Sequence, residues 1–269
     1  MKPLISVVIP TKNSSRTLEQ CLKSIFGQTY KNIEVVIVDS KSTDNTLHIA
    51  TRMQCEVIST DWKLLGAKYE GSKAASGDYI VLLDSDQFLE RTSLERCILL
   101  AEKYDMLCLE EMTYKGKTFI EKLYQADRRL VQREFDVQKD PLYGAVAPRF
   151  YRRDILNKAF SRIPHQILSF AVAREDAIIY YEAWKISTKV WILPNALWHV
   201  ELKSLIELWK KNFYYGKSTK KLVNDGYYTE LVKKKIRLRK TKEKISKDKV
   251  LSLFLLLLKG PPYFIGLYF

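Results

Sequence analysis

The sequence has few cysteines and no pattern that would pair them. Its four cysteines lie singly and form no Cys-x-x-Cys motif, so neither a zinc cluster nor secretion is expected. No apolar targeting segment stands before the first predicted strand, which together with the cysteine pattern favours a reduced, cytoplasmic setting. Free cysteine behaves mainly as a small hydrophobic residue, and we therefore expect buried thiols at Cys21, Cys55, Cys97 and Cys108.

Acidic residues are scarce in the last quarter of the chain. The formal net charge is +14, yet residues 201–269 hold 17 Lys and Arg against 6 Asp and Glu, while residues 1–200 hold 28 against 25. The basic character is therefore a property of the C-terminal region. Such a region fits nucleic acid, an anionic membrane or plain solvent, and charge alone does not choose among them.

Strand patterns alternate with helical patterns in the first part of the chain. Strands are predicted at four short runs rich in β-branched residues, namely 4–9, 33–38, 56–59 and 79–83. Pro10 is expected to stop the first of them, and helical spacing follows at 16–26 and 64–75. This alternation predicts an α/β fold whose mostly parallel sheet is covered by helices on both faces, with ligands bound at the carboxyl ends of the strands.

The periodicity is weaker beyond residue 86. Further elements are predicted as helices at 92–103, 119–131 and 176–186 and as strands at 106–109, 147–151 and 190–193. Pro194 is expected to end the last strand. Because no repeat or low-complexity linker interrupts the chain, we predict one catalytic domain over residues 1–202 and a basic helical region over residues 203–269.

Asp84-Ser85-Asp86 is the strongest single motif for chemistry. Two carboxylates that leave a buried strand at positions i and i+2 can share a divalent cation. Mn²⁺ and Mg²⁺ both prefer such oxygen ligands together with water and phosphate. A solvated acidic turn is the alternative for an isolated motif of this kind.

Three strings in order, residues 5–13 (ISVVIPTKN), 39–46 (DSKSTDNT) and 77–86 (GDYIVLLDSD), together resemble the family 2 glycosyltransferases. The resemblance covers roughly residues 3–200. It implies a GT-A fold and transfer of a sugar, with inversion, from a nucleotide diphosphate donor. It also implies that Asp84 and Asp86 hold Mn²⁺ or Mg²⁺ and that Ser85 contacts the nucleotide sugar.

The resemblance places Pro10, Thr11 and Asn13 in the loop beneath the nucleotide. Asp39 would accept hydrogen bonds from the base or the ribose, a role that suits a carboxylate at a strand end facing an open crevice. Capping of the next helix is the alternative for Asp39. The family usually has glycine where Lys41 stands, so this turn departs from the family pattern.

Lys68 stands where an arginine of the family often reaches the donor. A lysine can pair with a diphosphate as a point charge but lacks the bidentate fork, and a solvated helix residue is the alternative. His199 matches a histidine that some members place near the metal or the donor phosphates. Imidazole is a possible but not preferred ligand for Mg²⁺ or Mn²⁺, so simple local hydrogen bonding is the other interpretation.

Glu175-Asp176 resembles a Glu-Asp pair whose aspartate commonly acts as general base. Attack by an acceptor hydroxyl needs a carboxylate near that hydroxyl, and we assign this role to Asp176. Without the resemblance, both acids would simply favour the positive end of a helix dipole. Arg149, Arg152 and Arg153 flank a predicted strand as surface charges or phosphate contacts.

The C-terminal region combines basic and apolar segments. Two helices are predicted, one around 205–213 and one around 233–240, before the apolar run 250–258 that ends at Lys-Gly-Pro-Pro. Nine apolar residues are too few to span a bilayer, so we expect peripheral docking on the anionic, cytoplasmic side of the membrane. A core helix packed on the catalytic domain and a dimer interface are the alternatives.

These features together predict a metal-dependent inverting glycosyltransferase. The expected donor is GDP-mannose or a UDP-hexose, and the expected acceptor is a lipid-linked polyprenyl phosphate or diphosphate glycan. The sequence lacks the Gln-x-x-Arg-Trp motif of processive synthases, which favours transfer of one sugar. A nucleotidyltransferase and a nucleic-acid-binding protein are the alternatives, although no nucleic-acid partner is expected because aromatic residues are not interleaved with the basic ones.

Overall fold

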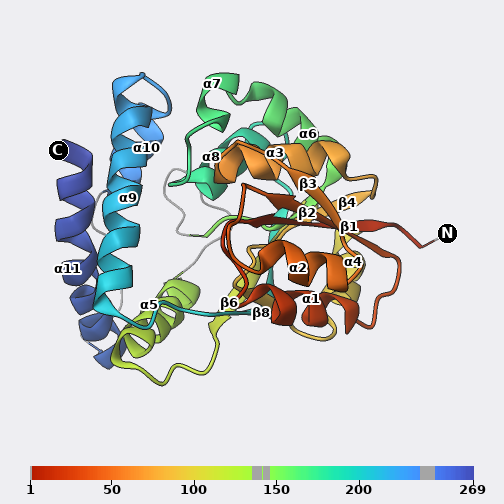
Figure 1. Ribbon diagram of the computed structural model, residues 1–269, viewed down its shortest axis with the longest axis horizontal. Helices are drawn as coiled ribbons and strands as arrows, with labels where there is room; N and C mark the ends of the chain where they lie inside the picture. Colours follow the sequence, from red (N-terminus) through yellow and green to blue (C-terminus); the bar gives the residue numbers. More distant parts are fainter. Residues whose placement is uncertain (1, 135–140, 142–145, 237–245) are drawn as a thin grey trace.

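One eight-stranded sheet lies at the centre of the fold in the computed structural model, which describes residues 2–134, 141, 146–236 and 246–269 (Figure 1). The strands are β1 (Ile5–Thr11), β2 (Ile33–Asp39), β3 (Glu56–Ser59), β4 (Tyr79–Leu82), β5 (Gln87–Leu89), β6 (Met106–Thr113), β7 (Phe150–Arg152) and β8 (Val190–His199). Their order across the sheet is β3-β2-β1-β4-β7-β6-β8-β5. The half from β3 to β4 is parallel, as predicted, whereas β7 and β5 run antiparallel to their neighbours and make the whole sheet mixed.

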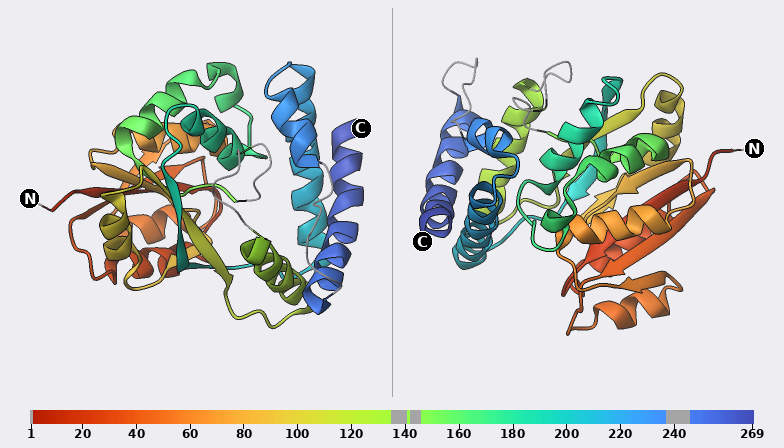
Figure 2. Two further views of the ribbon diagram at one scale, coloured as in Figure 1. Left: turned by 180° about the vertical axis from the view of Figure 1, so that it is seen from behind. Right: turned by 90° about the horizontal axis from the view of Figure 1, so that it is seen from above.

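Helices cover both faces of the sheet (Figure 2). One face carries α1 (Leu18–Phe26), α2 (Thr46–Arg52) and α4 (Ser93–Ala101), and the other carries α3 (Leu64–Ala74), α6 (Arg153–Arg162), α7 (His165–Leu168) and α8 (Glu175–Trp184). Successive residues of β1 point to opposite faces, so that Ile5, Val7 and Ile9 join one core and Val8 the other. Burial on both faces explains why β1 reads as a continuous apolar run.

Gly71 lets α3 lie directly on the sheet. A Cβ at this position would lie 2.3 Å from Cγ1 of Val8, closer than two atoms in contact can be. This close approach keeps α3 against β1 and directs the same helix's Lys68 toward the carboxyl end of the sheet. Of the four free cysteines, Cys21, Cys97 and Cys108 are buried as predicted, but Cys55 is only half-buried.

Two strands continue through a proline that the sequence predicts to end them. β1 includes Pro10 because β4 pairs with β1 only as far as Val8, so the missing N–H faces a position without a neighbour on that side. β8 includes Pro194 because the β6–β8 ladder shifts register between Leu109 and Glu111, and this bulge absorbs the proline. The prediction that each proline ends its strand is therefore wrong.

Four helices, α5 (Phe119–Glu134), α9 (Leu205–Asn224), α10 (Thr229–Ile236) and α11 (Lys247–Tyr268), stand to one side of the sheet (Figures 1 and 2). A capping box between Ser204 and Glu207 begins α9. Buried Leu123 of α5, Leu208 of α9 and Leu255 of α11 form a small apolar core. We call α5, α9 and α11 the helical layer. The part of the predicted basic helix at 237–240 lies outside the described residues.

The apolar C-terminal helix does not end where the sequence predicts. It passes through Pro261 and Pro262 to Tyr268, although each proline removes one backbone hydrogen bond. Proline's φ is compatible with a helix, and packing of α11 on α9 and α5 outweighs the lost bonds. Within the described residues α11 alone is long and apolar enough to cross a membrane, judged by length and composition, and 22% of its apolar window is buried. The expectation of a nine-residue segment is wrong.

Two glycines bring α9 and α11 into backbone contact. A Cβ on Gly216 would lie 2.1 Å from the carbonyl oxygen of Tyr263, and one on Gly266 would lie 2.1 Å from that of Phe213. Neither position has room for a side chain. The two helices therefore form one tightly packed pair.

Candidate active site

The carboxyl ends of β1 and β2 are tied together by the carboxylate of Asp39. The Thr11 hydroxyl donates to its Oδ1 at 2.8 Å, and Ser42 donates from its hydroxyl to Oδ1 at 2.6 Å and from its backbone N–H to Oδ2 at 2.8 Å. Asp39 is almost fully buried. In this arrangement it holds the turn that follows β2, in which Lys41 takes a φ of 59° where the family usually has glycine.

The loop after β1 joins the loops after β2 and β4 by hydrogen bonds. Asn13 accepts a bond of 2.8 Å at Oδ1 from the Thr43 N–H, and its own N–H donates to the Ser42 hydroxyl at 2.8 Å. The Ser85 hydroxyl donates to that of Ser14 at 2.8 Å. The predicted nucleotide-binding residues, with Pro10 at the end of β1, thus lie along one edge of the sheet.

Lys68 is fully buried and contacts three carboxylates. Its Nζ lies 2.6 Å from Asp176 Oδ1, 3.3 Å from Asp84 Oδ1 and 3.5 Å from Glu175 Oε1. Burial alone would lower the pKa of Lys68, but the three carboxylates outweigh this effect and hold the pKa above its ordinary value. The interpretation of Lys68 as a solvated helix residue is wrong, since its side chain is 0% exposed.

Arg149, which immediately precedes β7, is a second buried cation at this edge. Its guanidinium lies 3.1 Å from Asp84 Oδ2, 2.9 Å from Glu111 Oε1 and 3.5 Å from Asp176 Oδ2. Burial raises the pKa of Asp84, yet Lys68 and Arg149 outweigh this and lower it to about 2. Asp84 is therefore held ionised by two cations, and the default interpretation of Arg149 as a surface charge is wrong.

Glu175 and Asp176 begin α8 immediately after Arg174, whose φ is 67°. Both carboxylates face Lys68, although Asp176 makes the shorter contact and keeps 28% of its side chain exposed. Burial raises the pKa of Glu175 to about 7, because Lys68 offsets only part of the cost of burying its charge. The pair thus combines an accessible, ion-paired carboxylate with a buried one that takes up a proton near neutral pH.

Asp86 and His199 face each other at the opposite side of Asp84. The His199 Nε2 lies 3.7 Å from Asp86 Oδ1, and its Nδ1 lies 3.4 Å from Glu201 Oε2. Burial lowers the pKa of His199, but Asp86 and Glu201 outweigh it and raise the pKa. Arg128 of α5 donates to Glu201 Oε1 at 2.5 Å and also pairs with Glu111. The helical layer is thereby connected to the sheet edge.

The structure brings the predicted acidic, lysine and histidine residues into one chain of charged groups. Asp39 and Asn13 lie beside this chain, in hydrogen bonds of their own. The sequence interpretation missed Glu111, Arg128 and Glu201. Charged residues at a strand end or on an amphipathic helix are usually solvated, so no local signal marks these three. Across the residues that the structure describes, no three His, Cys, Asp or Glu groups converge into a metal cluster.

The sequence model of the family described as Glycosyl transferase family 2 matches residues 6–180, which is more than half of the chain. The chain belongs to this family. The resemblance seen in the three strings is thereby confirmed. The matched segment of this family 2 chain contains every predicted site residue except His199.

Curated relatives of this family 2 chain carry glycosyltransferase names. Glycosyltransferase GlyG of Streptococcus pneumoniae serotype 4 is 36% identical over 102 residues, which cover 35% of this chain and 34% of GlyG. Uncharacterized glycosyltransferase RP128 of Rickettsia prowazekii is 27% identical over 228 residues, which cover 82% of this chain and 69% of that protein. The chain spans only about a third of the length of GlyG and of GlyA, another S. pneumoniae glycosyltransferase, at 34% and 33%.

Solved structures share the fold of this family 2 chain. S. aureus TarS 1–349 in complex with UDP-GlcNAc superposes with a TM-score of 0.59 at 16% identity, covering 97% of this chain and 81% of that one. The mannosyltransferase PcManGT from Pyrobaculum calidifontis, in complex with GDP-Man and Mn2+, superposes with a TM-score of 0.56 at 16% identity, covering 97% and 74%. This likeness confirms the predicted GT-A-type α/β fold.

Proposed function

We propose that the protein is a metal-dependent inverting glycosyltransferase that moves one sugar from a nucleotide diphosphate to a lipid-linked acceptor. The observation that carries this proposal is the convergence of Lys68, Asp84 and Asp176 at the carboxyl edge of the sheet, beside the loops after β1 and β2. Family membership supports the same reaction class. It does not favour a nucleotidyltransferase or a nucleic-acid-binding protein.

The donor is a UDP-hexose or GDP-mannose. TarS and PcManGT, which share the fold, have structures in complex with UDP-GlcNAc and with GDP-Man. In this chain Pro10, Thr11 and Asn13 would support the nucleotide, with Ser85 beside it. To bind the base or ribose directly, the Asp39 carboxylate must give up one of its present hydrogen bonds, such as the one from the Ser42 hydroxyl. The diphosphate would then approach Lys68, whose ammonium group acts as a point charge and lacks the bidentate geometry of an arginine guanidinium.

Of the three predicted metal ligands, Asp86 and His199 are arranged to bind a divalent metal and Asp84 is not. Asp86 is 35% exposed and His199 turns Nε2 toward it, while Glu201 faces the other ring nitrogen, an arrangement typical of a metal-binding histidine. Asp84 is instead engaged by Lys68 and Arg149. Mg²⁺ and Mn²⁺ commonly use one or two protein ligands together with water and substrate phosphates. A metal held by Asp86 and His199 would stabilise negative charge on the leaving diphosphate.

Asp176 accepts the proton in the proposed reaction. The acceptor hydroxyl oxygen attacks the anomeric carbon, the bond from that carbon to the diphosphate oxygen breaks, and the hydroxyl proton passes to Asp176. Lys68 orients this carboxylate by a 2.6 Å contact. Asp176, whose side chain is 28% exposed, is more accessible to an acceptor than Glu175, whose side chain is 12% exposed. Glu175 is the alternative proton acceptor, and a mutational test must distinguish it from Asp176.

The acceptor side includes the C-terminal region, which we propose as residues 203–269 beside a catalytic domain of residues 1–202. Apolar side chains of α9 and α11 are exposed in a region rich in lysine, including Ile206, Trp209, Leu253, Leu257 and Phe264. Apolar and aromatic groups beside basic ones are typical of a protein that docks on an anionic membrane. We therefore propose peripheral attachment at the cytoplasmic side of the membrane.

A panel of nucleotide sugars with Mn²⁺ or Mg²⁺ tests the proposal. UDP-hexoses and GDP-mannose are added to the full chain, and thermal stabilisation and release of UDP or GDP are measured. We expect one donor to stabilise the protein and to be hydrolysed or transferred only with metal. Release of pyrophosphate would identify a nucleotidyltransferase, and no response to any donor would overturn the proposal.

A further inference from the structure

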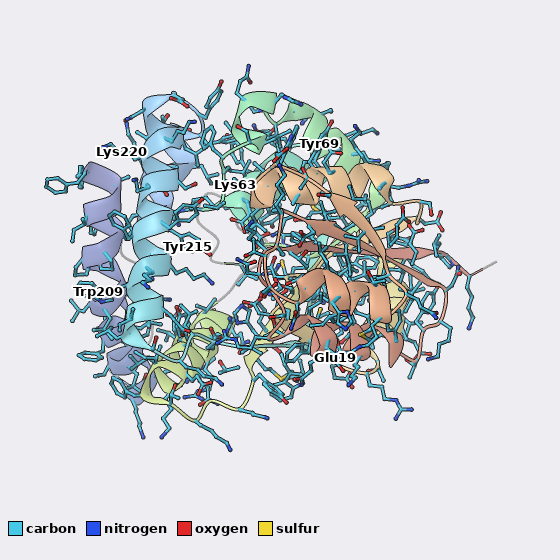
Figure 3. The ribbon with its side chains drawn as sticks, viewed as in Figure 1. Glu19, Lys63, Tyr69, Trp209, Tyr215 and Lys220 are labelled. Atoms are coloured by element: carbon cyan, nitrogen blue, oxygen red, sulfur yellow. The ribbon has the colours of Figure 1, made fainter. Side chains whose placement is uncertain are left out.

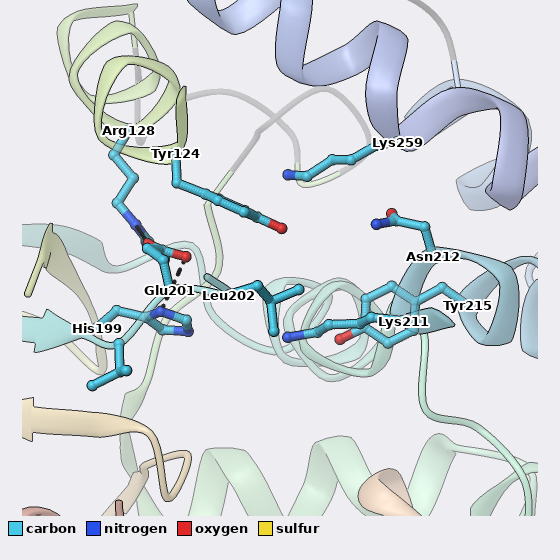
Figure 4. Close-up of a pocket in the computed structure, with 10 residues that line it drawn as sticks. Tyr124, Arg128, His199, Glu201, Leu202, Lys211, Asn212, Tyr215 and Lys259 are labelled. Atoms are coloured by element: carbon cyan, nitrogen blue, oxygen red, sulfur yellow. Dashed lines mark hydrogen bonds and ion pairs between the residues drawn. The ribbon is translucent and has the colours of Figure 1, made fainter. Parts of the chain in front are cut away.

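A polar cavity of about 180 Å³ separates the helical layer from the end of β8 (Figure 4). Its wall comes from α5, α9, α11 and the segment after β8, through Tyr124, Lys211, Asn212, Tyr215, Leu202 and Lys259. At one end it reaches His199 and Glu201, and therefore adjoins the proposed active site. Pockets for drug-sized ligands occupy roughly 300–1,000 Å³, so this cavity suits a small group rather than a whole nucleotide sugar.

Neither lysine of the cavity forms a salt bridge with an acidic residue in the described ranges. Lys211 extends from α9 and Lys259 from α11 into the same space. Asp86 and Asp84 act on Lys211, and Asp127 and Glu201 act on Lys259, through longer-range electrostatic attraction only. Lys259 instead lies over the Tyr124 ring, 4.0 Å from its centroid. Glu201, the carboxylate in the cavity wall, is already bonded to Arg128. Two cations thus point into a cavity whose acid is neutralised.

Neutral hydrogen-bond donors complete the wall. Burial raises the pKa of Tyr124 and of Tyr215, so both phenols keep their protons at physiological pH. Figure 3 shows Tyr215 pointing from α9 toward the sheet, into the region of this cavity. Phenol hydroxyls and ammonium groups both donate to oxyanions. The wall therefore combines positive charge with donors that a tetrahedral oxyanion requires.

The position of Lys259 in the wall of the cavity destabilises the folded protein. This lysine interrupts an otherwise apolar helix, and burial lowers its pKa to about 8. A lysine at this position would normally be exposed or paired, because a desolvated charge without a partner destabilises a protein. Binding of an anionic ligand by the ammonium group would offset this cost, which explains why a lysine stands at this position.

We propose that this cavity binds the phosphate group of the acceptor, with Lys211 and Lys259 as the cations that hold it. The inference rests on the proposed function, which places a phosphate-bearing lipid at this side of the enzyme. The cavity lies between the carboxyl edge of the sheet and the exposed apolar side chains of α11, such as Leu257. A lipid phosphate bound here would keep its hydrocarbon chain near α11 and direct the attached glycan toward Asp176.

The test measures binding rather than turnover, with geranyl phosphate as the probe and geraniol as its uncharged control. We compare Lys211→Gln and Lys259→Gln with Lys210→Gln, which removes an exposed lysine next to Lys211 on the same helix. We expect the Kd for geranyl phosphate to rise at least tenfold in the first two variants and to stay within twofold in the third. Removal of an unpaired, partly buried charge should also leave Lys259→Gln at least as heat-stable as the parent chain.

Binding of UDP and GDP to the same variants distinguishes the two possible sources of phosphate. Unchanged nucleotide affinity in all of them supports an acceptor site, whereas loss of UDP or GDP affinity would place the donor diphosphate in the cavity and overturn the assignment. Failure of the parent chain to bind geranyl phosphate, or equal binding by all variants, would also overturn it. If the expected pattern appears but no nucleotide sugar is ever turned over, the phosphate site stands and the proposed transferase activity fails.

Discussion

The carboxyl edge of the sheet and the helical layer differ in whether their cations are paired with carboxylates. At the edge, Lys68 and Arg149 are buried and each contacts three carboxylates. In the layer, Lys211 and Lys259 face a cavity and form no salt bridge within the described residues, while apolar side chains such as Leu257 are exposed. The two cations of the edge are paired within the chain, whereas these two cations of the layer are not.

This contrast indicates where each region obtains its stability. Charges at the edge are held by groups of the same fold, so a change there should disturb folding and chemistry together. Lys211, Lys259 and the exposed apolar groups of the layer lack such partners, so a change at these groups should mainly disturb binding. The following variants break or sharpen this contrast, in order of decreasing expected effect.

Lys68→Met should have the largest effect. It leaves Asp84, Glu175 and Asp176 without their shared cation, and loss of one partner from a buried ionic cluster costs about 3–5 kcal/mol. Urea unfolding measures the change, with Lys73→Met as a control because Lys73 is exposed on the same helix. Equal stability of the two variants would show that the buried cluster contributes little.

Asp176→Asn should remove catalysis but destabilise the fold less than Lys68→Met, because Lys68 keeps Asp84 and Glu175 as partners. The amide keeps the shape of the carboxylate but cannot accept the acceptor's proton, so we expect a decrease in kcat of about 10²–10⁴-fold. Affinity for the nucleotide sugar should change little in a titration monitored by protein fluorescence. A normal rate in this variant, together with a large loss in Glu175→Gln, would assign proton transfer to Glu175.

The double variant Leu253→Glu/Leu257→Glu should release the protein from anionic liposomes. Each leucine is exposed on α11, and burying a leucine in an apolar environment gains about 1.5–3 kcal/mol, which glutamate forfeits. Flotation measures the bound fraction. Leu99→Glu is the matched control, since Leu99 is 68% exposed on α4, close to the 70% of Leu257. Equal flotation of both variants would contradict membrane docking through α11.

Glu175→Gln should stabilise the protein in a pH-dependent way. Burial raises the pKa of Glu175 from 4.5 to about 7, so its ionisation is less favourable in the folded state than in the unfolded state. The resulting destabilisation is absent below pH 4.5, grows between pH 4.5 and 7, and is fully present above pH 7. We expect the variant to gain about 1–3 kcal/mol at pH 8 and almost nothing at pH 4. A gain that is independent of pH would contradict this origin.

Affinity for geranyl phosphate should fall as the pH rises above about 8, the pKa to which burial lowers Lys259. Above this pH the free protein loses the ammonium proton and must regain it to bind an anion, so the Kd rises by up to about tenfold per pH unit. Asp127 and Arg128 on α5, Glu201 after β8 and Lys211 on α9 are the charged groups that act on Lys259. Lys259→Gln should show no such dependence.

The parallel half of the sheet and its acidic motifs were predictable from sequence, and the reason is local. Buried strands such as β1 and β2 appear as short apolar runs, and residues at their carboxyl ends share one edge by topology alone. This placed Asp39 and Asp84 correctly at the edge. Lys68 was found through family resemblance, but its burial was not, because burial depends on Gly71 bringing α3 onto β1.

The remaining features depend on contacts between distant parts of the chain. Arg149 reaches Glu111, and Arg128 reaches Glu201, across separations of 38 and 73 residues. No pattern in a single segment reports such pairs. Similarly, the continuation of β8 through Pro194 depends on a bulge beside β6, and that of α11 through Pro261 on packing against α9.

The glycine contact between α9 and α11 limits how the protein can meet a lipid bilayer. Because Gly216 and Gly266 leave no room between the backbones, α11 cannot enter a bilayer end-on without drawing in α9 and its five lysines. The backbone hydrogen bonds that Pro261 and Pro262 remove from α11 add a further cost in hydrocarbon. On a membrane, α11 would therefore lie along the surface and hold the sheet edge at a fixed height. The protein would then select acceptors by length, accepting only glycans whose reactive hydroxyl lies at that distance from the lipid headgroups.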